Sequence, residues 1–263
     1  MPAARTQIVA TAALAALVLA TTSRLAPAVA RDQPGEFDFY VLALSIAPSF
    51  CDLTGYQKHK AQCAHPSDTD YRETPLTIHG LWPNRRGTPA RDQPQACSTE
   101  RLPAFSDELA RDLRTYMPGV ADGLAQYEWS KHGVCSGLAP EAYFRHIVAL
   151  ARAANQTIGA AMKDKGFFGK PMAVSALVEA VAAKSQALAD ALIVDCQFAR
   201  KVPGGAASRA YVGEIRVLIA KDIGGASQTA GWPAAFMPRT AVGYGANSGC
   251  PQGIGFVPGS FAD

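Results

Sequence analysis

The chain has 263 residues, with 25 basic and 22 acidic side chains and a formal net charge of +3. Such a small net charge excludes polyanion binding by overall charge, so any affinity for nucleic acid must come from a local cluster. The length suits one large domain or two small ones, and because the sequence contains no internal repeat and no linker-like stretch, we expect one.

The first thirty residues have the features of a secretory signal peptide. Arg5 gives a positive start, IVATAALAALVLA is an apolar run too short to span a bilayer, and Ala28-Val29-Ala30 supplies small residues for cleavage. Loss of this leader (1–30) removes two arginines and leaves 23 basic and 22 acidic residues in 31–263. No later run is long and apolar enough to cross a membrane. We therefore expect a periplasmic or secreted protein with no membrane association once the leader is removed.

The first part of the remaining chain predicts two strands separated by a loop. FDFYVLALSI (37–46) is almost continuously apolar, which is typical of a strand buried on both faces. Residues 51–75 hold two cysteines and many polar groups and predict a disulfide-stapled loop. PLTIHGLWP (75–83) predicts a short strand bounded by prolines.

Helical patterns dominate the middle of the chain. FSDELARDLRTYM (105–117) and PEAYFRHIVALARA (140–153) repeat apolar residues at helical spacing, and AVSALVEAVAAKSQALADAL (173–192) predicts one long helix. EIRVLIAK (214–221) alternates and predicts a strand, whereas the glycine-rich tail from 222 on has no clear pattern. Strands and helices without a regular βαβ repeat indicate an α+β fold.

The segment YEWSKHGVCSG (127–137) concentrates ionisable groups between glycines. If it is helical, with Gly133 ending the helix in a left-handed cap, each residue turns by about 100°. One arc then carries four polar side chains: Tyr127, Glu128, Lys131 and His132. Glu128 and His132 form an (i, i+4) pair within contact distance, and Trp129 points the other way, toward the core. Such an arc is typical of the wall of a site, which Cys135 would hold covalently.

The earlier segment TIHGLWPNRR (77–86) places a second histidine on a strand. Alternation sends Thr77 and His79 to the same face, and Gly80 allows another group to approach closely. Trp82 follows as a rigid aromatic shelf. Two imidazoles, a carboxylate, a lysine and an aromatic ring suit cleavage of RNA by its own 2′-hydroxyl, because imidazoles exchange protons near neutral pH and a lysine stabilises the charged phosphorane.

All six cysteines lie after the leader, and an even number in an exported chain predicts three disulfides, with 15 possible pairings. A metal site is less well supported, because the cysteine spacings are long and irregular and no CxxC is present.

TIHGLWPN and YEWSKHGVCSG resemble the two active-site segments of the ribonuclease T2 family, and FDFYVLALSIAPSFC and FSDELARDLRTYMPG are similar to its first strand and to the helix before the second segment. The resemblance implies a central antiparallel sheet flanked by helices in one disulfide-stabilised catalytic domain (31–263). It also implies an endoribonuclease that forms 2′,3′-cyclic phosphate ends on single-stranded RNA, spares DNA and uses no metal or cofactor. We expect a monomer.

The resemblance also implies roles for single residues. His79 would be the general acid and His132 the general base, Glu128 and Lys131 would stabilise the phosphate, and Trp82 and Asn84 would hold the base. The implied disulfides are Cys51 with Cys63, Cys97 with Cys135, and Cys196 with Cys250.

The sequence departs from the family at Tyr127, where a phosphate-binding histidine is usual. This departure is the one point in favour of an alternative function, that of an inactive exported RNA-binding or inhibitory protein of the same fold. The presence of both catalytic histidines favours the enzyme. A metal hydrolase built on His79, Glu128 and His132 is a third hypothesis, which the lack of an HExxH motif disfavours.

Overall fold

The computed structural model describes residues 32–53, 59–64, 67–198, 209–223 and 231–261. These residues belong to one unit of dense internal contacts, Asp32–Asp263. The expected leader (1–30) lies outside the described residues. Within the described ranges, no helix has the length and apolar character needed to cross a membrane.

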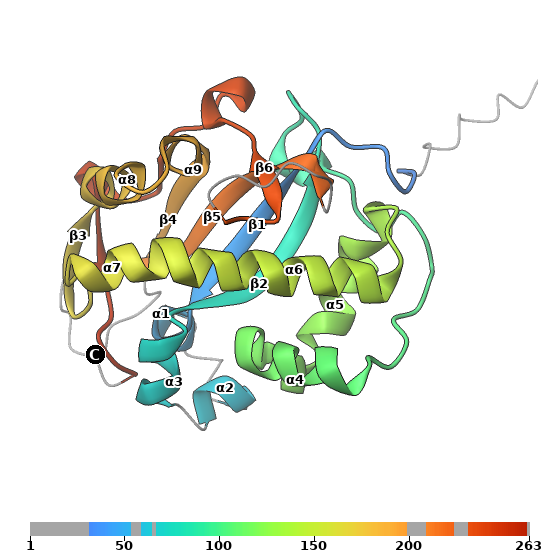
Figure 1. The fold of residues 1–263 in the computed structure, drawn as a ribbon, viewed down its shortest axis with the longest axis horizontal. Helices are drawn as coiled ribbons and strands as arrows, with labels where there is room; N and C mark the ends of the chain where they lie inside the picture. The colour runs from blue at the N-terminus through green and yellow to red at the C-terminus, as the bar shows by residue number, and fades with distance from the viewer. Residues whose placement is uncertain (1–31, 54–58, 65–66, 199–208, 224–230, 262–263) are drawn as a thin grey trace, which may run out of the picture. The chain divides into compact units, whose positions relative to one another are not determined.

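A largely antiparallel sheet forms the centre of this unit (Figure 1). Its strands, in spatial order, are β2 (Leu76–Asn84), β1 (Phe39–Ile46), β5 (Ala210–Ile223), β4 (Leu192–Phe198) and β7 (Asn247–Ser248). Only β7 pairs in parallel along this path. Three short strands extend the sheet: β3 (Lys170–Ala173), β6 (Ala234–Phe236) and β8 (Ile254–Val257). The predicted α+β class with a central antiparallel sheet is confirmed.

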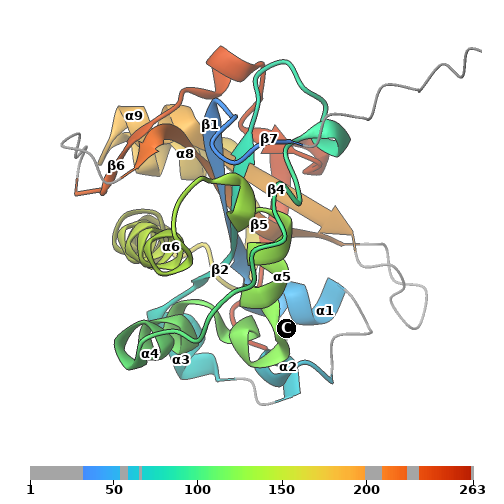
Figure 2. The ribbon, with the colours of Figure 1, turned by 90° about the vertical axis from the view of Figure 1, so that its right-hand side faces the viewer.

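Helix α6 (Pro140–Ala154) covers one face of the sheet (Figures 1 and 2). It continues through a π-helical turn, η5 (Asn155–Gly159), into α7 (Ala160–Asp164). The hydroxyl of Tyr143 donates to the Leu81 carbonyl across 2.6 Å, which joins the helix to β2. The prediction of this helix, with proline in its first turn, is confirmed.

The predicted helix at 105–117 is α4 (Asp107–Tyr116), followed by η3 (Pro118–Asp122), α5 (Leu124–Lys131) and η4 (Gly133–Cys135). Ser106 begins α4 by accepting a hydrogen bond from the Leu109 amide at 3.4 Å. Shorter 3₁₀ turns are η2 (Ala90–Asp92), η6 (Arg239–Val242) and η7 (Pro251–Gly253).

Two predicted elements, the loop at 51–75 and the helix at 173–192, differ from the structure. The stapled loop predicted at 51–75 contains short helices, which are α1 (Ala47–Leu53), α2 (Ala61–Ala64) and α3 (Asp68–Glu73). The long helix predicted at 173–192 is broken into α8 (Val174–Ala182) and α9 (Gln186–Ala191). Ser185 makes this break, because it is extended (φ −160°, ψ 110°) and its side chain caps α9 through the Leu188 amide.

Three disulfides connect segments of the chain that are 12 to 54 residues apart in the sequence. Cys51–Cys63 joins α1 to α2, Cys97–Cys135 joins the chain before α4 to η4, and Cys196–Cys250 joins β4 to the segment after β7. These are the pairs that the resemblance implies, and no described cysteine is free.

Candidate active site

A β-bulge in β2 determines the position of His79. Gly80 is opposite Ala43 and Ile78 is opposite Leu44, so His79 is the additional residue between the two pairs. Bulges of this kind redirect a side chain and are frequent at active sites. His79 and Thr77 line the same cavity, in agreement with the alternation, and the His79 side chain is 36% exposed.

Helix α5 forms the wall opposite His79. Trp129 is fully buried and donates to the Glu100 carbonyl at 3.0 Å, so this ring fixes the helix in the core as predicted. Glu128 is also buried (1% exposed), whereas Tyr127 is 52% exposed.

The end of α5 differs from the prediction of a left-handed glycine cap. The helix ends at Lys131 with His132 as the C-cap, and Gly133 begins η4 without a positive φ. Glycine is needed at 133 for space, because a Cβ there would overlap the Trp129 ring.

Two carboxylates face the His79 imidazole. Its Nδ1 lies 2.5 Å from Glu214 Oε1, and its Nε2 lies 3.7 Å from Glu128 Oε1. Burial by itself would lower the pKa of His79, but the hydrogen bond and charge of Glu214, together with the charge of Glu128, raise that pKa above 6.5. His79 is therefore biased toward the imidazolium form.

Glu214 is held in turn by Arg216. The guanidinium lies 2.8 Å from Glu214 Oε2 and 3.2 Å from Asp195 Oδ2. Burial would raise the pKa of Glu214, but the hydrogen bond and charge of His79 and the charge of Arg216 lower it, which keeps this carboxylate ionised.

The Trp82 indole lies between the two histidines. Its ring centre is 5.1 Å from that of His79 and 5.5 Å from that of His132. Its Nε1 donates to Glu128 Oε2 at 2.8 Å. Burial raises the pKa of Glu128, despite the opposing effects of His79, this hydrogen bond and Lys131.

His132 has the opposite electrostatic environment to His79. Burial, with the positive charges of Lys131 and His79, lowers the pKa of His132 to about 3. Its Nδ1 is buried and has no hydrogen-bond partner among the described residues. The carboxylate of Glu128, expected to pair with His132, contacts Trp82 and His79 instead. His132 is therefore a neutral imidazole over most of the pH range.

The other predicted residues lie around this centre. The ammonium of Lys131 donates to the Tyr127 hydroxyl at 3.0 Å. Asn84 is buried, and its amide donates to the Trp82 carbonyl at 3.0 Å, which ties it to the backbone of its own strand.

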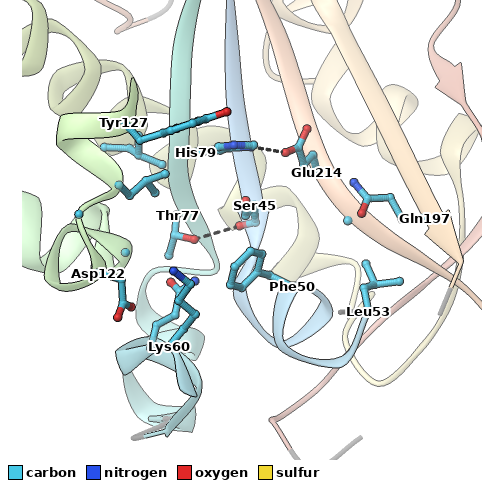
Figure 3. Close-up of a pocket in the computed structure, with 16 residues that line it drawn as sticks. Ser45, Phe50, Leu53, Lys60, Thr77, His79, Asp122, Tyr127, Gln197 and Glu214 are labelled. Atoms are coloured by element: carbon cyan, nitrogen blue, oxygen red, sulfur yellow. Dashed lines mark hydrogen bonds and ion pairs between the residues drawn. The ribbon is translucent and has the colours of Figure 1, made fainter. Parts of the chain in front are cut away.

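Two cavities meet at His79 and Tyr127. The Trp82 cavity, of about 670 Å³, is lined by both histidines and, from the tail, by residues 243–245 and 247–248. The Thr77 cavity, of about 560 Å³, has His79 and Glu214 on one side and Lys60 on the other (Figure 3). Within the described residues, no three His, Cys, Asp or Glu side chains converge as they would around a metal ion.

The sequence model of the Ribonuclease T2 family matches residues 37–224, a range that contains both motifs and the Glu214 strand. The chain belongs to the ribonuclease T2 family.

Among curated relatives in this family, Ribonuclease I of Escherichia coli (strain K12) is 33% identical over 166 residues, which cover 53% of this chain and 62% of the relative. A ribonuclease of Aeromonas hydrophila is 36% identical over 112 residues, or 41% of this chain and 42% of the relative. The chain thus matches less than two thirds of the length of these relatives.

Ribonuclease MC1 from bitter gourd seeds shares the fold, with a TM-score of 0.57, at 20% sequence identity, over 84% of this chain and 100% of the plant chain.

Sequence reasoning missed the contribution of β5 and of the tail to this ribonuclease T2 site. Glu214 and Arg216 occupy alternate positions in a part of β5 (210–220) that is otherwise apolar, and this pattern is a usable signal. Tyr244 and Ser248 line the Trp82 cavity from a segment whose sequence has no clear pattern.

Proposed function

We propose that this protein is a metal-independent endoribonuclease that cleaves RNA by attack of the 2′-hydroxyl and forms 2′,3′-cyclic phosphate ends. One observation carries the proposal. Two histidines lie on either side of the Trp82 ring, and their surroundings shift their pKa values in opposite directions. A pair of groups with separated pKa values is what an acid and a base need in order to act together at one pH.

The roles follow from these directions. His132, which is neutral, takes the proton of the 2′-hydroxyl as its oxygen attacks phosphorus. His79, which is protonated, gives a proton to the 5′ oxygen as the P–O5′ bond breaks. The products are a 2′,3′-cyclic phosphate and a free 5′-hydroxyl, and the histidines have exchanged protonation states.

Two side chains stabilise the phosphorane. Lys131 supplies a positive charge beside His132, and Glu128, whose pKa is raised by burial, supplies a hydrogen-bonding carboxyl group. Tyr127 lies at the rim where the cavities meet and offers a neutral hydroxyl in place of the usual imidazole.

The two cavities suit the two nucleosides that flank one phosphodiester. Trp82 offers an aromatic face for a base, and Asn84 lines the same cavity. The structurally similar ribonuclease MC1 has a mutant whose crystal structure is a complex with 5′-UMP. Single-stranded RNA is the expected substrate because its bases are free to enter, and DNA lacks the nucleophile.

The proposal includes an exported enzyme. Residues 31–263 would be the catalytic domain, active as a monomer in the periplasm or medium after removal of the leader 1–30.

Digestion of matched oligonucleotides tests the activity. The protein is incubated in excess EDTA with a single-stranded RNA, with the same strand carrying one 2′-deoxy nucleotide, and with DNA. We expect 2′,3′-cyclic phosphate products from RNA, no cut at the deoxy position and intact DNA. His79→Ala and His132→Ala should each lower kcat by about 100-fold or more. Loss of activity in EDTA would favour the metal hydrolase, and binding of RNA without turnover would favour the inactive alternative.

A further inference from the structure

His79 and Glu214 come from strands that are not neighbours, since β1 lies between β2 and β5. Adjacent strands are about 4.8 Å apart, so the two side chains must extend across β1 to meet. The two residues of β1 that lie beside this contact are small: Ala43 is opposite Arg216 and Ser45 is opposite Glu214. Figure 3 shows His79 and Glu214 pointing toward each other across this strand.

Glu214 also has a fixed orientation. Its Oε1 faces His79 Nδ1 at 2.5 Å, and its Oε2 accepts from Arg216 Nε at 2.8 Å. Arg216 contacts Asp195, whose other oxygen accepts from the Ser248 hydroxyl at 2.7 Å. The carboxylate is only 8% exposed. A chain of polar contacts therefore extends from the imidazole through β5 and β4 to β7.

We propose that Glu214 is a positioning residue for His79, which fixes the imidazole plane and keeps a proton on Nδ1 so that Nε2 is the nitrogen that exchanges protons with the substrate. The inference rests on the proposed function and adds a residue that neither motif contains. The Nε2 atom is on the side of Glu128 and the Trp82 cavity, where the phosphodiester would lie.

The proton transfers balance with this arrangement. The imidazolium carries protons on both nitrogens, and the Nε2 proton goes to the 5′ oxygen as the P–O5′ bond breaks. The imidazole that remains is neutral, protonated on Nδ1 and still bonded to Glu214. Nε2 is then free to accept a proton from water when the cyclic phosphate is opened.

Removal of the Glu214 charge should shift the titration of His79. The groups that face His79 are Glu214 and Arg216 from β5, Glu128, Tyr127 and His132 from α5 and its C-cap, and Trp82 from β2. In Glu214→Gln, burial and Arg216 still lower the pKa of His79, the charge of Glu128 still raises it, and the neutral amide oxygen can still accept a hydrogen bond from Nδ1. The pKa of His79 should fall by about 1 pH unit, because a hydrogen bond to a charged group is replaced by a weaker neutral one.

Kinetics and NMR together test the proposal. Purified wild type, Glu214→Gln and the control Glu179→Gln, an exposed glutamate of α8, are compared by pH profiles of kcat/KM and by titration of ¹⁵N-histidine. In Glu214→Gln we expect the alkaline limb to move to lower pH by the same amount as the His79 titration. The value of kcat should fall about tenfold or more, with KM changed less than about threefold. Glu179→Gln should match wild type.

If Glu214→Gln does not fold, the ¹⁵N-histidine NMR spectrum of wild type still shows which nitrogen of neutral His79 carries the proton. Neutral His79 should keep its proton on Nδ1, and the Nε2–H tautomer would overturn the inference. An unchanged alkaline limb and unchanged His79 titration in folded Glu214→Gln would also overturn it. If wild type does not cut RNA, the proposed function fails, while the tautomer and the titration still test the contact between Glu214 and His79.

Discussion

Gly80 lies next to the hydrogen bond between Trp82 and Glu128, and we expect a methyl group at this position to displace both side chains. A Cβ at this position would overlap Glu128 Oε2 and would lie 2.5 Å from Trp82 Nε1. Neither atom is at the end of a free side chain, because Glu128 is buried and the two atoms share a hydrogen bond of 2.8 Å. Close approach at Gly80 was predicted from the sequence, and these two side chains are the groups that approach.

The magnitude of the effect follows from these contacts. Gly80→Ala forces extra volume into a packed site, which costs about 1–3 kcal/mol. Loss of the hydrogen bond to the carboxylate costs about 1.5–3 kcal/mol more. Lower entropy of the unfolded chain offsets about 0.4–1 kcal/mol. We expect Gly80→Ala to lower the free energy of unfolding by about 2–5 kcal/mol and to lower kcat, since the displaced side chains face His79.

Urea unfolding with intact disulfides and steady-state RNA cleavage measure both effects. Gly213→Ala is the matched control for stability, because it is also a strand glycine at a bulge. Its Cβ would lie 3.0 Å from the side chain of Gln197, which is exposed and makes only a 3.4 Å hydrogen bond to Asp195 Oδ2. The control should stay within about 1 kcal/mol of wild type. If Gly80→Ala unfolds like Gly213→Ala and keeps its kcat, the geometry assigned to Trp82 and Glu128 is wrong.

Three further predictions concern pH, Tyr127 and the disulfide at Cys135. With the proposed roles, kcat/KM needs neutral His132 and protonated His79. It should therefore fall to half near pH 3, form a plateau at higher pH, and decline again at a pH above 6.5. A narrow optimum centred on pH 6.5 would contradict the assigned roles. Tyr127→Phe should raise KM by the factor that corresponds to loss of one neutral hydrogen bond, about 0.5–1.5 kcal/mol. Tyr127→His should keep or increase activity at acidic pH. If Tyr127→Phe lowered kcat as much as His132→Ala does, the tyrosine would take part in the proton transfers. Replacement of both Cys97 and Cys135 by alanine removes a disulfide between residues 38 apart in the sequence. It should lower the free energy of unfolding by about 4 kcal/mol by the loop-entropy relation, and it should lower kcat because η4 directly follows His132. A variant with full activity and wild-type stability would show that the disulfide does not hold His132 in place.

The sequence predicts those elements whose residue patterns are strong and local. Strand β1 is apolar on both faces, and helix α4 is capped by Ser106 and has an apolar stripe, so both were assigned correctly. The pattern failed at Ser185, because the residues on both sides of it repeat at helical spacing and a single cap is hard to see in an alanine-rich run. The helices at 47–53, 61–64 and 68–73 are too short to show a period.

The candidate site was predicted to the extent that it lies in two short motifs. His79, Trp82, Glu128, Lys131 and His132 come together as expected, because a strand and a helix each present several of them on one face. The acceptor for His79 Nδ1 was not predicted, since it lies 135 residues away and depends on strand order and register. No local pattern specifies that β5, rather than another strand, lies next to β1.

That distant contact is what separates the two histidines chemically. Burial acts on both imidazoles in the same direction, since it lowers the pKa of His79 as well as that of His132. The difference lies in the neighbours. His132 has Lys131 beside it, whereas His79 has Glu214 at Nδ1 and Glu128 near Nε2. Glu128 also accepts a hydrogen bond from Trp82 and its pKa is raised by burial, whereas the pKa of Glu214 is lowered, so Glu214 is the more fully ionised of the two carboxylates that face His79. The assignment of His79 as the acid therefore depends on a strand outside both motifs, and a chain with both motifs but no acidic residue at the position of Glu214 should lose this separation.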